Sequence, residues 1–252
     1  MKILRAEEIM MNFGGLRAVD SFNLIIEDNE LVGLIGPNGA GKTTIFNIIT
    51  GVYKPTKGSI SLCGKNIKGR KPSEISKLGI SRTFQNIRLF SDLTVLDNVK
   101  IGMSNRFDYN LLTGMFKLPE YFKQEEEMNK QALELLKIFD LDKFSDYIAR
   151  NLPYGKQREL EIARALASKP KLLLLDEPAA GMNPQETDNL MKTIKKVRDE
   201  FNVAILLIEH DMQLVMGICE RIMVLNYGKI LAEGTSEEIQ NNPEVVKAYL
   251  GA

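Results

Sequence analysis

The chain has 252 residues, of which 33 are Lys or Arg and 33 are Asp or Glu, so its formal net charge is zero. With 44% hydrophobic and 26% charged residues, it is not a disordered, collagen-like or disulfide-scaffold protein. The neutral balance gives no basic surface of the kind that binds nucleic acid, so no nucleic-acid partner is expected. The length suits one large domain or two intimate subdomains.

The sequence also gives little support for membrane-spanning segments, metal clusters or disulfides. The apolar runs fall far short of the roughly 20 residues that cross a bilayer, and Glu7 and Glu8 precede any signal-peptide core, which favours the cytoplasm. Cys63 and Cys219 are far apart in the sequence and are interpreted as reduced packing residues. His210 is the one histidine, which excludes multi-histidine metal sites.

The first part of the chain predicts β structure and then a strand, loop and helix. Short strands are expected within residues 3–28, with a turn at Asp28-Asn29, and another strand pair around residues 59–62. Between them, residues 31–35 form a continuous apolar run that ends in glycines and leads into a helical pattern over residues 42–50.

The middle of the chain looks helical. Residues 102–120 mix aromatic residues with Gly and Pro, so an irregular or short-helical insertion is expected there. Residues 124–139 predict an amphipathic helix, because apolar residues recur on one helical face: Met128, Ala132, Leu135, Leu136 and Phe139.

Two apolar runs, residues 172–175 and 203–208, predict buried parallel strands joined by a crossover helix. Asn183, Pro184 and Glu186 mark the start of that helix as an N-cap, an N1 proline and a capping-box acid. A hairpin is then predicted over residues 222–232. Thr235 and Glu238 predict a capping box for a closing helical segment.

One sequence stretch matches the phosphate-binding loop in full and lies between the predicted strand and helix: Gly36-Pro37-Asn38-Gly39-Ala40-Gly41-Lys42-Thr43, followed by Thr44. Glycines allow the backbone to wind around phosphates, so that N–H groups and the helix N-terminus meet the negative charge. Lys42 adds a positive charge, and Thr43 offers a hydroxyl group to Mg²⁺. This loop predicts ATP or GTP binding.

The run Leu172 to Leu175 ends in Asp176 and Glu177, as a Walker-B strand does. Asp176 is positioned to hold magnesium through water, and Glu177 to orient and polarise an attacking water molecule. A buried strand followed by a solvated acid pair would explain the run alone, but the phosphate loop favours the functional interpretation.

Further motifs make the chain resemble the ATP-binding-cassette (ABC) ATPases over nearly its whole length: Thr83-Phe84-Gln85 at the end of a strand, Asn151 to Gln157, and Ile208-Glu209-His210-Asp211. The resemblance implies that Gln85 meets Mg²⁺ and the attacking water, and that His210 touches the γ-phosphate. It also implies that Phe13 stacks on adenine. Glu177, His210, Gln85 and Lys42 are then the catalytic set, with Thr43, Gln85 and Asp176 around the metal.

The implied fold is an α/β P-loop nucleotide-binding domain with a mixed sheet core, an antiparallel β subdomain and an inserted helical subdomain. We expect a single ABC ATPase domain over residues 1–252. Its α/β core would comprise residues 1–85 and 161–234, its helical subdomain residues 86–160, and its closing helical segment residues 235–252.

Within the family, residues 79–90, 152–166, 179–184 and 208–212 resemble the ATP-binding subunits of branched-chain amino-acid importers, as does the ending over residues 232–251. This implies ATP-driven uptake with two membrane permeases, a second ABC ATPase and an extracytoplasmic binding protein. The chain would lie on the inner face of the cell membrane. Residues 85–96 are the expected surface that transmits motion to the permeases.

Two positions depart from the general cassette pattern. The signature usually reads Leu-Ser-Gly-Gly-Gln, whereas here it is Leu152, Pro153, Tyr154, Gly155 and Lys156. In the family the signature acts on the ATP of the partner subunit, so we hypothesise two unequal sites, with Lys156 or the helix dipole supplying part of the missing attraction. At the D-loop, where the family usually has aspartate, this chain has Asn183. Its position as the N-cap of the following helix is a sufficient structural explanation for the asparagine.

Three alternatives remain open from the sequence. An ATPase for lipid or lipopolysaccharide export shares similar motifs, although it would be expected to retain Ser-Gly-Gly in the signature. A DNA-repair or chromosome-organising cassette protein would need coiled-coil arms or a DNA-binding module, for which this chain has no room. A non-catalytic nucleotide-binding module is disfavoured by Glu177 and His210, although the altered signature keeps this alternative open.

Overall fold

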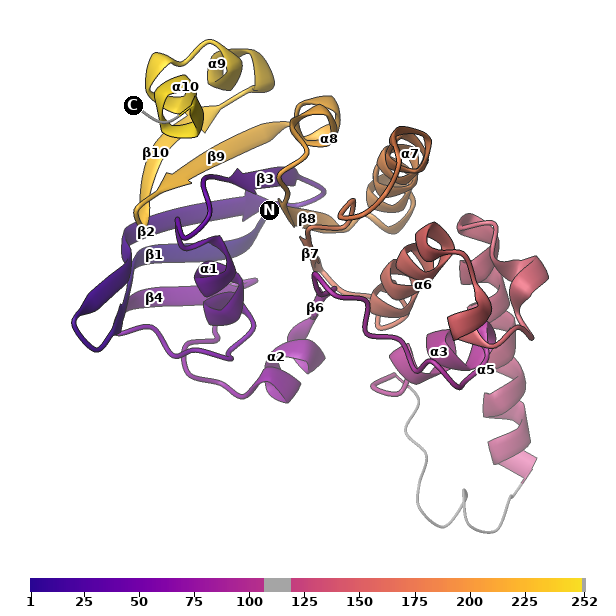
Figure 1. The fold of residues 1–252 in the computed structure, drawn as a ribbon. Helices are drawn as coiled ribbons and strands as arrows, with labels where there is room; N and C mark the ends of the chain where they lie inside the picture. The colour runs from indigo at the N-terminus through magenta and orange to yellow at the C-terminus, as the bar shows by residue number, and fades with distance from the viewer. Residues whose placement is uncertain (107–118, 251–252) are drawn as a thin grey trace. The chain divides into compact units, whose positions relative to one another are not determined.

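The computed structural model describes residues 1–106 and 119–250 (Figure 1). The chain divides into two compact units, which are described separately: a core unit of residues 1–82 and 171–252, and a helical unit of residues 83–170. Most of the insertion predicted at residues 102–120 lies outside the described residues. Among the described helices, none is both long and apolar enough to cross a membrane.

The core unit contains an antiparallel sheet of order β2-β1-β4-β5. Its strands are β1 (Lys2–Phe13), β2 (Leu16–Glu27), β4 (Lys57–Leu62) and β5 (Lys65–Asn66). The prediction of short strands over residues 3–28 was wrong in length, because β1 and β2 are 12 residues each. Register shifts and the left-handed backbone of Glu8 and Ser21 interrupt the alternation, so each long strand resembles shorter pieces in the sequence.

A second sheet of order β10-β9-β3-β8-β7-β6 positions the site. Its strands are β3 (Leu31–Ile35), β6 (Ile80–Arg82), β7 (Leu172–Asp176), β8 (Ala204–Ile208), β9 (Arg221–Asn226) and β10 (Lys229–Gly234). The pairs are parallel except for the β9–β10 hairpin. All residues of β3, β7 and β8 are buried, which explains their unbroken apolar sequences. The predicted strands and hairpin are confirmed.

The helices of the core unit are α1 (Lys42–Ile49), α2 (Pro72–Leu78), α7 (Pro184–Phe201), α8 (Met212–Ile218), α9 (Ser236–Gln240) and α10 (Pro243–Leu250). One hydrophobic core joins α1 to residues of both sheets. Both predicted capping boxes are confirmed: Asn183 accepts a hydrogen bond from the Glu186 N–H at 3.0 Å, and Thr235 accepts one from the Glu238 N–H at 3.4 Å.

The described part of the other unit is built from helices. These are α3 (Val95–Gly102), α5 (Pro119–Ile138), α6 (Tyr154–Leu166) and the short 3₁₀ helices Asp142–Phe144 and Ala149–Asn151. The predicted apolar face of α5 is confirmed, because all its members are buried: Met128, Ala132, Leu135, Leu136 and, just beyond the helix, Phe139. The spacing of the apolar residues in the sequence therefore predicted which face of α5 is buried.

Candidate nucleotide-binding site

The predicted loop connects β3 to α1, as phosphate binding requires. Two of its positions accept only glycine. A Cβ atom on Gly36 would lie 2.0 Å from the Leu225 carbonyl oxygen, and one on Gly41 would lie 2.7 Å from the Ala18 carbonyl oxygen. Gly41 also has a φ of 110°, which side chains rarely adopt. The carbonyl groups of β9 and β2 therefore leave no room for a side chain at these two positions of the loop.

The N-terminus of α1 is suited to an anion. Gly41 provides no side-chain cap, and the first turn contains no acidic residue. The first N–H groups of the helix and the positive end of its dipole are therefore presented to the loop rather than to a capping side chain. This geometry fits the phosphate groups of a nucleotide.

Lys42 lies folded along the loop and is buried. Its Nζ atom donates to the carbonyl oxygens of Gly36 at 2.6 Å and Pro37 at 3.0 Å. Burial lowers the pKa of Lys42, while the charges of Glu177 and Asp176 oppose that shift. The lysine thus lies in the field of both acids at the end of β7.

A cavity of about 190 Å³ collects most of the predicted site residues of the core unit. It is lined by Ala18, Asn38, Gly39, Ala40, Gly41, Lys42, Thr43, Thr44, Glu177 and His210. Ala18, on β2, was not predicted, because a small apolar residue in a strand carries no motif. The loop, the Walker-B glutamate and the histidine therefore share one cavity, as the motif order suggested.

Glu177 and His210 are brought together by paired strands, since Asp176 lies opposite Ile208 in the β7–β8 register. Oε1 of Glu177 lies 2.8 Å from Nε2 of His210. Glu177 has a φ of 48°, and its N–H donates to the Ile208 carbonyl at 2.8 Å. A glutamate in left-handed backbone is strained, and such strain gathers at functional sites.

Glu209 supports this arrangement and was not predicted as a functional residue. Its carboxylate is buried and accepts three backbone N–H bonds, from Ala179 at 2.7 Å, His210 at 2.9 Å and Asp211 at 3.3 Å. Burial raises the pKa of Glu209, while those N–H groups oppose the shift. The side chain thereby joins the chain segments that follow β7 and β8.

Asp176 is buried at the end of β7 and forms an ion pair with Arg82, whose Nη2 lies 2.7 Å from Oδ2 of the aspartate. Arg82 was missed in the sequence, although a charged residue in a short strand beside the Gln85 motif is a usable signal. Thr43 and Asp176 offer hard oxygen atoms, which Mg²⁺ prefers. In the described part of the chain, no cluster of three or more His, Cys, Asp or Glu side chains could hold a metal. A metal bound mainly by substrate phosphates and a few protein oxygens fits this donor set.

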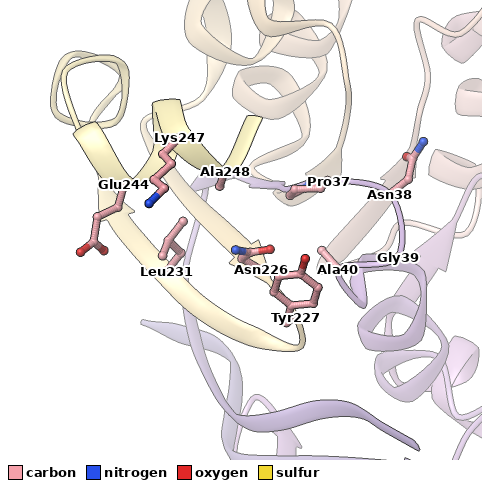
Figure 2. Close-up of a pocket in the computed structure, with 10 residues that line it drawn as sticks. All are labelled: Pro37, Asn38, Gly39, Ala40, Asn226, Tyr227, Leu231, Glu244, Lys247 and Ala248. Carbon is pink, nitrogen blue, oxygen red and sulfur yellow. The ribbon is translucent and has the colours of Figure 1, made fainter. Parts of the chain in front are cut away.

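A second cavity, of about 620 Å³, lies along the phosphate loop on the side of the β9–β10 hairpin and α10 (Figure 2). Pro37 and Asn38 line it together with Tyr227 and Lys247. Burial raises the pKa of Tyr249, on α10, to about 12, and a hydrogen bond from the Gly36 backbone opposes the shift. The closing helix therefore contacts the start of the loop.

Phe13 ends β1 and does not line the cavity that holds Glu177. Its side chain is 40% exposed and meets Tyr53 edge to face, with ring centroids 5.2 Å apart. The ring therefore lies partly exposed, outside that cavity.

The remaining predicted residues belong to the helical unit. Thr83-Phe84-Gln85 was predicted to end a strand, but β6 ends at Arg82 and these residues lie just beyond it. Side chains of α6 bond to the backbone there: Arg158 donates to the carbonyl oxygens of Phe84 and Gln85 at 2.7 Å each. A side-chain partner on a distant helix is invisible in the local pattern.

Of the signature residues, Leu152 and Pro153 precede α6, and Tyr154, Gly155 and Lys156 are its first three residues. Its N-cap, Pro153, makes no side-chain capping bond, and the first turn has no acidic residue. Lys156 donates to Glu159 at 2.6 Å and to the Phe139 carbonyl at 3.2 Å. The charge of Lys156 is therefore balanced locally.

The glycine loop between a buried strand and a helix, together with the acids at the neighbouring strand end, defines a P-loop nucleoside triphosphatase. The ABC transporter family model matches residues 19–180, and a branched-chain amino acid ATP-binding cassette transporter model matches residues 229–252. The chain belongs to the ABC transporter family, within the group of branched-chain amino acid transport ATP-binding proteins.

The relatives support this over nearly the whole length. The chain is 49% identical to the high-affinity branched-chain amino acid transport ATP-binding protein BraF of Pseudomonas aeruginosa, with 99% of this chain and 98% of BraF covered. It is 47% identical to LivG of Escherichia coli K12 at the same coverage. The chain also aligns with a crystal structure of the ADP conformation of an ATP-binding cassette of an ABC transporter. The alignment covers 100% of both chains, with 32% sequence identity and a TM-score of 0.87. The predicted family, ABC-type fold and ATPase activity are confirmed.

Proposed function

We propose that this ABC ATPase powers the import of branched-chain amino acids, as the peripheral ATP-hydrolysing subunit on the inner face of the cell membrane. The observation that carries the proposal is the near-full-length similarity to BraF and LivG, which includes the closing segment over residues 229–252. Its partners would be two membrane permeases, a second ABC ATPase and an extracytoplasmic binding protein.

In this proposal, the loop from Gly36 to Thr44 holds the phosphate groups of ATP. The N–H groups at the start of α1 and the Lys42 ammonium bind the negative oxygens, while Phe13 stacks on the adenine ring. The uncapped helix N-terminus supports this assignment, as does the position of Lys42 among the loop carbonyls. Phosphate binding would draw the ammonium away from those carbonyls.

Hydrolysis requires a base that removes a proton from water. We assign this role to Glu177, because its carboxylate lines the phosphate-loop cavity at a strained backbone position. The hydrogen bond to His210 orients that carboxylate, and the histidine side chain, 43% exposed, is available to the γ-phosphate. Gln85 is assigned to the attacking water because the motif Thr83-Phe84-Gln85 resembles that of the family.

Thr43, Asp176 and Gln85 are assigned to magnesium. The bound cation would neutralise charge on the phosphate oxygens. The Thr43 hydroxyl and the Asp176 carboxylate provide the oxygen atoms from α1 and β7, respectively.

Permease docking is assigned to residues 85–96, the proposed transmission surface. Two apolar residues of this segment, Phe90 and Leu93, are 47% and 38% exposed. Their surroundings are ordered, because the Phe90 N–H donates to the Asn98 side chain at 2.9 Å. An ordered, exposed apolar segment suits a partner surface.

The altered signature supports two unequal ATP sites in the assembled pair. Pro153 has neither an N–H nor a hydroxyl group to offer the partner's ATP. Because Lys156 is balanced by Glu159, we assign the remaining attraction to the N-terminus of α6. Converting Pro153-Tyr154 to Ser-Gly should change the hydrolysis rate of the assembled transporter, and an unchanged rate would refute the hypothesis.

The decisive test of the proposed function is to purify the tagged chain with MgATP from gently solubilised membranes and identify its partners by mass spectrometry. Two permeases and a second, distinct ABC ATPase are the expected result. Recovery as a homodimer on a lipid-export complex would instead favour the export alternative. Recovery with no membrane partner would favour a non-transport ATPase.

A further inference from the structure

Arg82 joins two elements that carry the proposed magnesium ligands. It lies at the end of β6, opposite Leu174 of β7. Side chains opposite each other on neighbouring parallel strands lie on the same face, and Asp176, two residues beyond Leu174, shares that face. The guanidinium group therefore reaches across the end of β7 toward α1, the helix that begins at the phosphate loop.

The contacts of the guanidinium group are divided between β7 and α1. Nη2 lies 2.7 Å from Oδ2 of Asp176, and Nη1 lies 2.7 Å from Oδ1 of Asn47 on α1. The Cζ atom lies 5.4 Å from the ring centroid of Phe46, which is fully buried. With its side chain only 9% exposed, Arg82 is held by an ion pair, an amide and an aromatic ring at once.

The position of Asn47 gives these contacts a functional consequence. Asn47 follows Thr43 by four residues on α1, so the two lie about one turn apart on the same helical face. Arg82 thus links α1, which carries the Thr43 hydroxyl, to the end of β7, which carries the Asp176 carboxylate. The rigid fork of an arginine fixes such a separation, whereas a lysine ammonium provides a single flexible point of attachment.

We propose that Arg82 is a positioning residue for magnesium: it sets the separation between Thr43 and Asp176 at which the two side chains hold the ion with ATP. The proposal rests on the proposed magnesium role of Asp176. Groups that orient metal ligands commonly change metal affinity by about 10–100-fold when removed. Arg82 therefore affects magnesium-dependent binding more than binding of the phosphates themselves.

The test uses the full chain with Glu177→Gln as a background, so that ATP is bound without turnover. ATP affinity is measured by calorimetry in EDTA and again with excess Mg²⁺, for Arg82→Met, Arg82→Lys and the background chain. For Arg82→Met, we expect affinity in EDTA to stay within about threefold, while the strengthening by Mg²⁺ falls by about tenfold or more. Arg82→Lys keeps the ion pair but cannot bridge to Asn47 in the same way, so an intermediate loss is expected.

Arg221→Met is the matched control. Arg221 also forms an ion pair within the core unit, with Nε 2.7 Å from Glu30, but it lies on β9, opposite Val32, and β3, β8 and β7 separate that strand from β6. This variant should retain the full effect of Mg²⁺. Urea denaturation of each variant shows that it is folded, and if Arg82→Met does not fold, Arg82→Lys decides the result.

Asp176→Asn separates the two possible failures. If Asp176→Asn loses the magnesium effect while the folded Arg82 variants keep it, the positioning role is wrong and the proposed site stands. If Asp176→Asn keeps the effect, the magnesium assignment of Asp176 fails, and the inference fails with it. Equal loss of ATP affinity with and without Mg²⁺ in the Arg82 variants would show a structural role only.

Discussion

Arg158 and Glu161, one turn apart on α6, form an ion pair of 3.0 Å in which the side chains are 0% and 1% exposed. Both residues also bind the backbone around Gln85: Arg158 donates to two carbonyl groups, and Glu161 accepts N–H bonds from Phe84 at 3.4 Å and Arg88 at 3.2 Å. The helix that begins within the signature motif therefore holds the Gln85 loop through both its backbone carbonyl and its N–H groups.

Replacing Arg158 with Met should destabilise the helical unit, because it leaves the Glu161 carboxylate buried without its cation. Breaking one partner of such a buried pair costs about 3–5 kcal/mol. The loss is measured as a lower free energy of unfolding in urea. The double variant Arg158→Met, Glu161→Leu should recover part of that stability, since it leaves no buried charge but still lacks the bonds to the backbone around Gln85. A double variant no more stable than the single one would contradict this account.

Replacing Glu177 with Gln should slow ATP hydrolysis by about 10²–10⁴-fold, because an amide cannot accept a proton from water. ATP binding should persist, since the amide keeps a similar shape and a hydrogen-bonding oxygen. Steady-state phosphate release measures the first effect, and calorimetry with MgATP measures the second.

Glu237→Gln is the control for that experiment, because Glu237 is an exposed acid in the first turn of α9. It should hydrolyse ATP at the original rate. If Glu177→Gln also retained full activity, the assignment of Glu177 as the base would be wrong.

Replacing Gly36 or Gly41 with Ala should abolish tight ATP binding, because each added Cβ atom would overlap a backbone carbonyl oxygen. Neither Leu225 nor Ala18 can withdraw a main-chain oxygen without moving a strand, so the loop itself must shift. Gly15→Ala is the matched control, since a Cβ atom at Gly15 meets nothing within 4 Å. Calorimetric titration with ATP distinguishes the variants, and unchanged affinity for Gly41→Ala would contradict the proposed loop geometry.

The local sequence predicted those parts of the site that have a local cause. The phosphate loop and the apolar run before Asp176 are contiguous, and the alignment of Asp176 with Ile208 follows from two buried parallel strands. The supporting contacts of Arg82 and Glu209 were not predictable in this way. Arg82 meets Asp176, 94 residues away, and Glu209 meets Ala179, 30 residues away, and only the folded sheet edge brings these pairs together.

The lengths of β1 and β2 were also not predicted, for a different physical reason. Glu8 and Ser21 adopt left-handed backbone within β1 and β2, so the inward and outward positions exchange along each strand. A pattern with a strict period of two then stops at each irregularity, although the strand continues. The helical face of α5 has no such interruption and was predicted completely.

The two cysteines should differ sharply in reactivity in the folded protein. Cys219 is buried, and burial raises the pKa of its thiol to about 12. Because the thiolate is the reactive form, Cys219 should resist iodoacetamide at pH 8 until the protein unfolds. Cys63 is half-buried, so it should react first.

Mass spectrometry of labelled peptides over time measures both rates, with urea-unfolded protein as the reference in which the rates converge. The raised pKa also fixes the direction with pH: labelling of Cys219 in the folded state should increase only in strongly alkaline solution. Rapid labelling of Cys219 at pH 8 in the folded protein would show that the β9 side of the core opens readily.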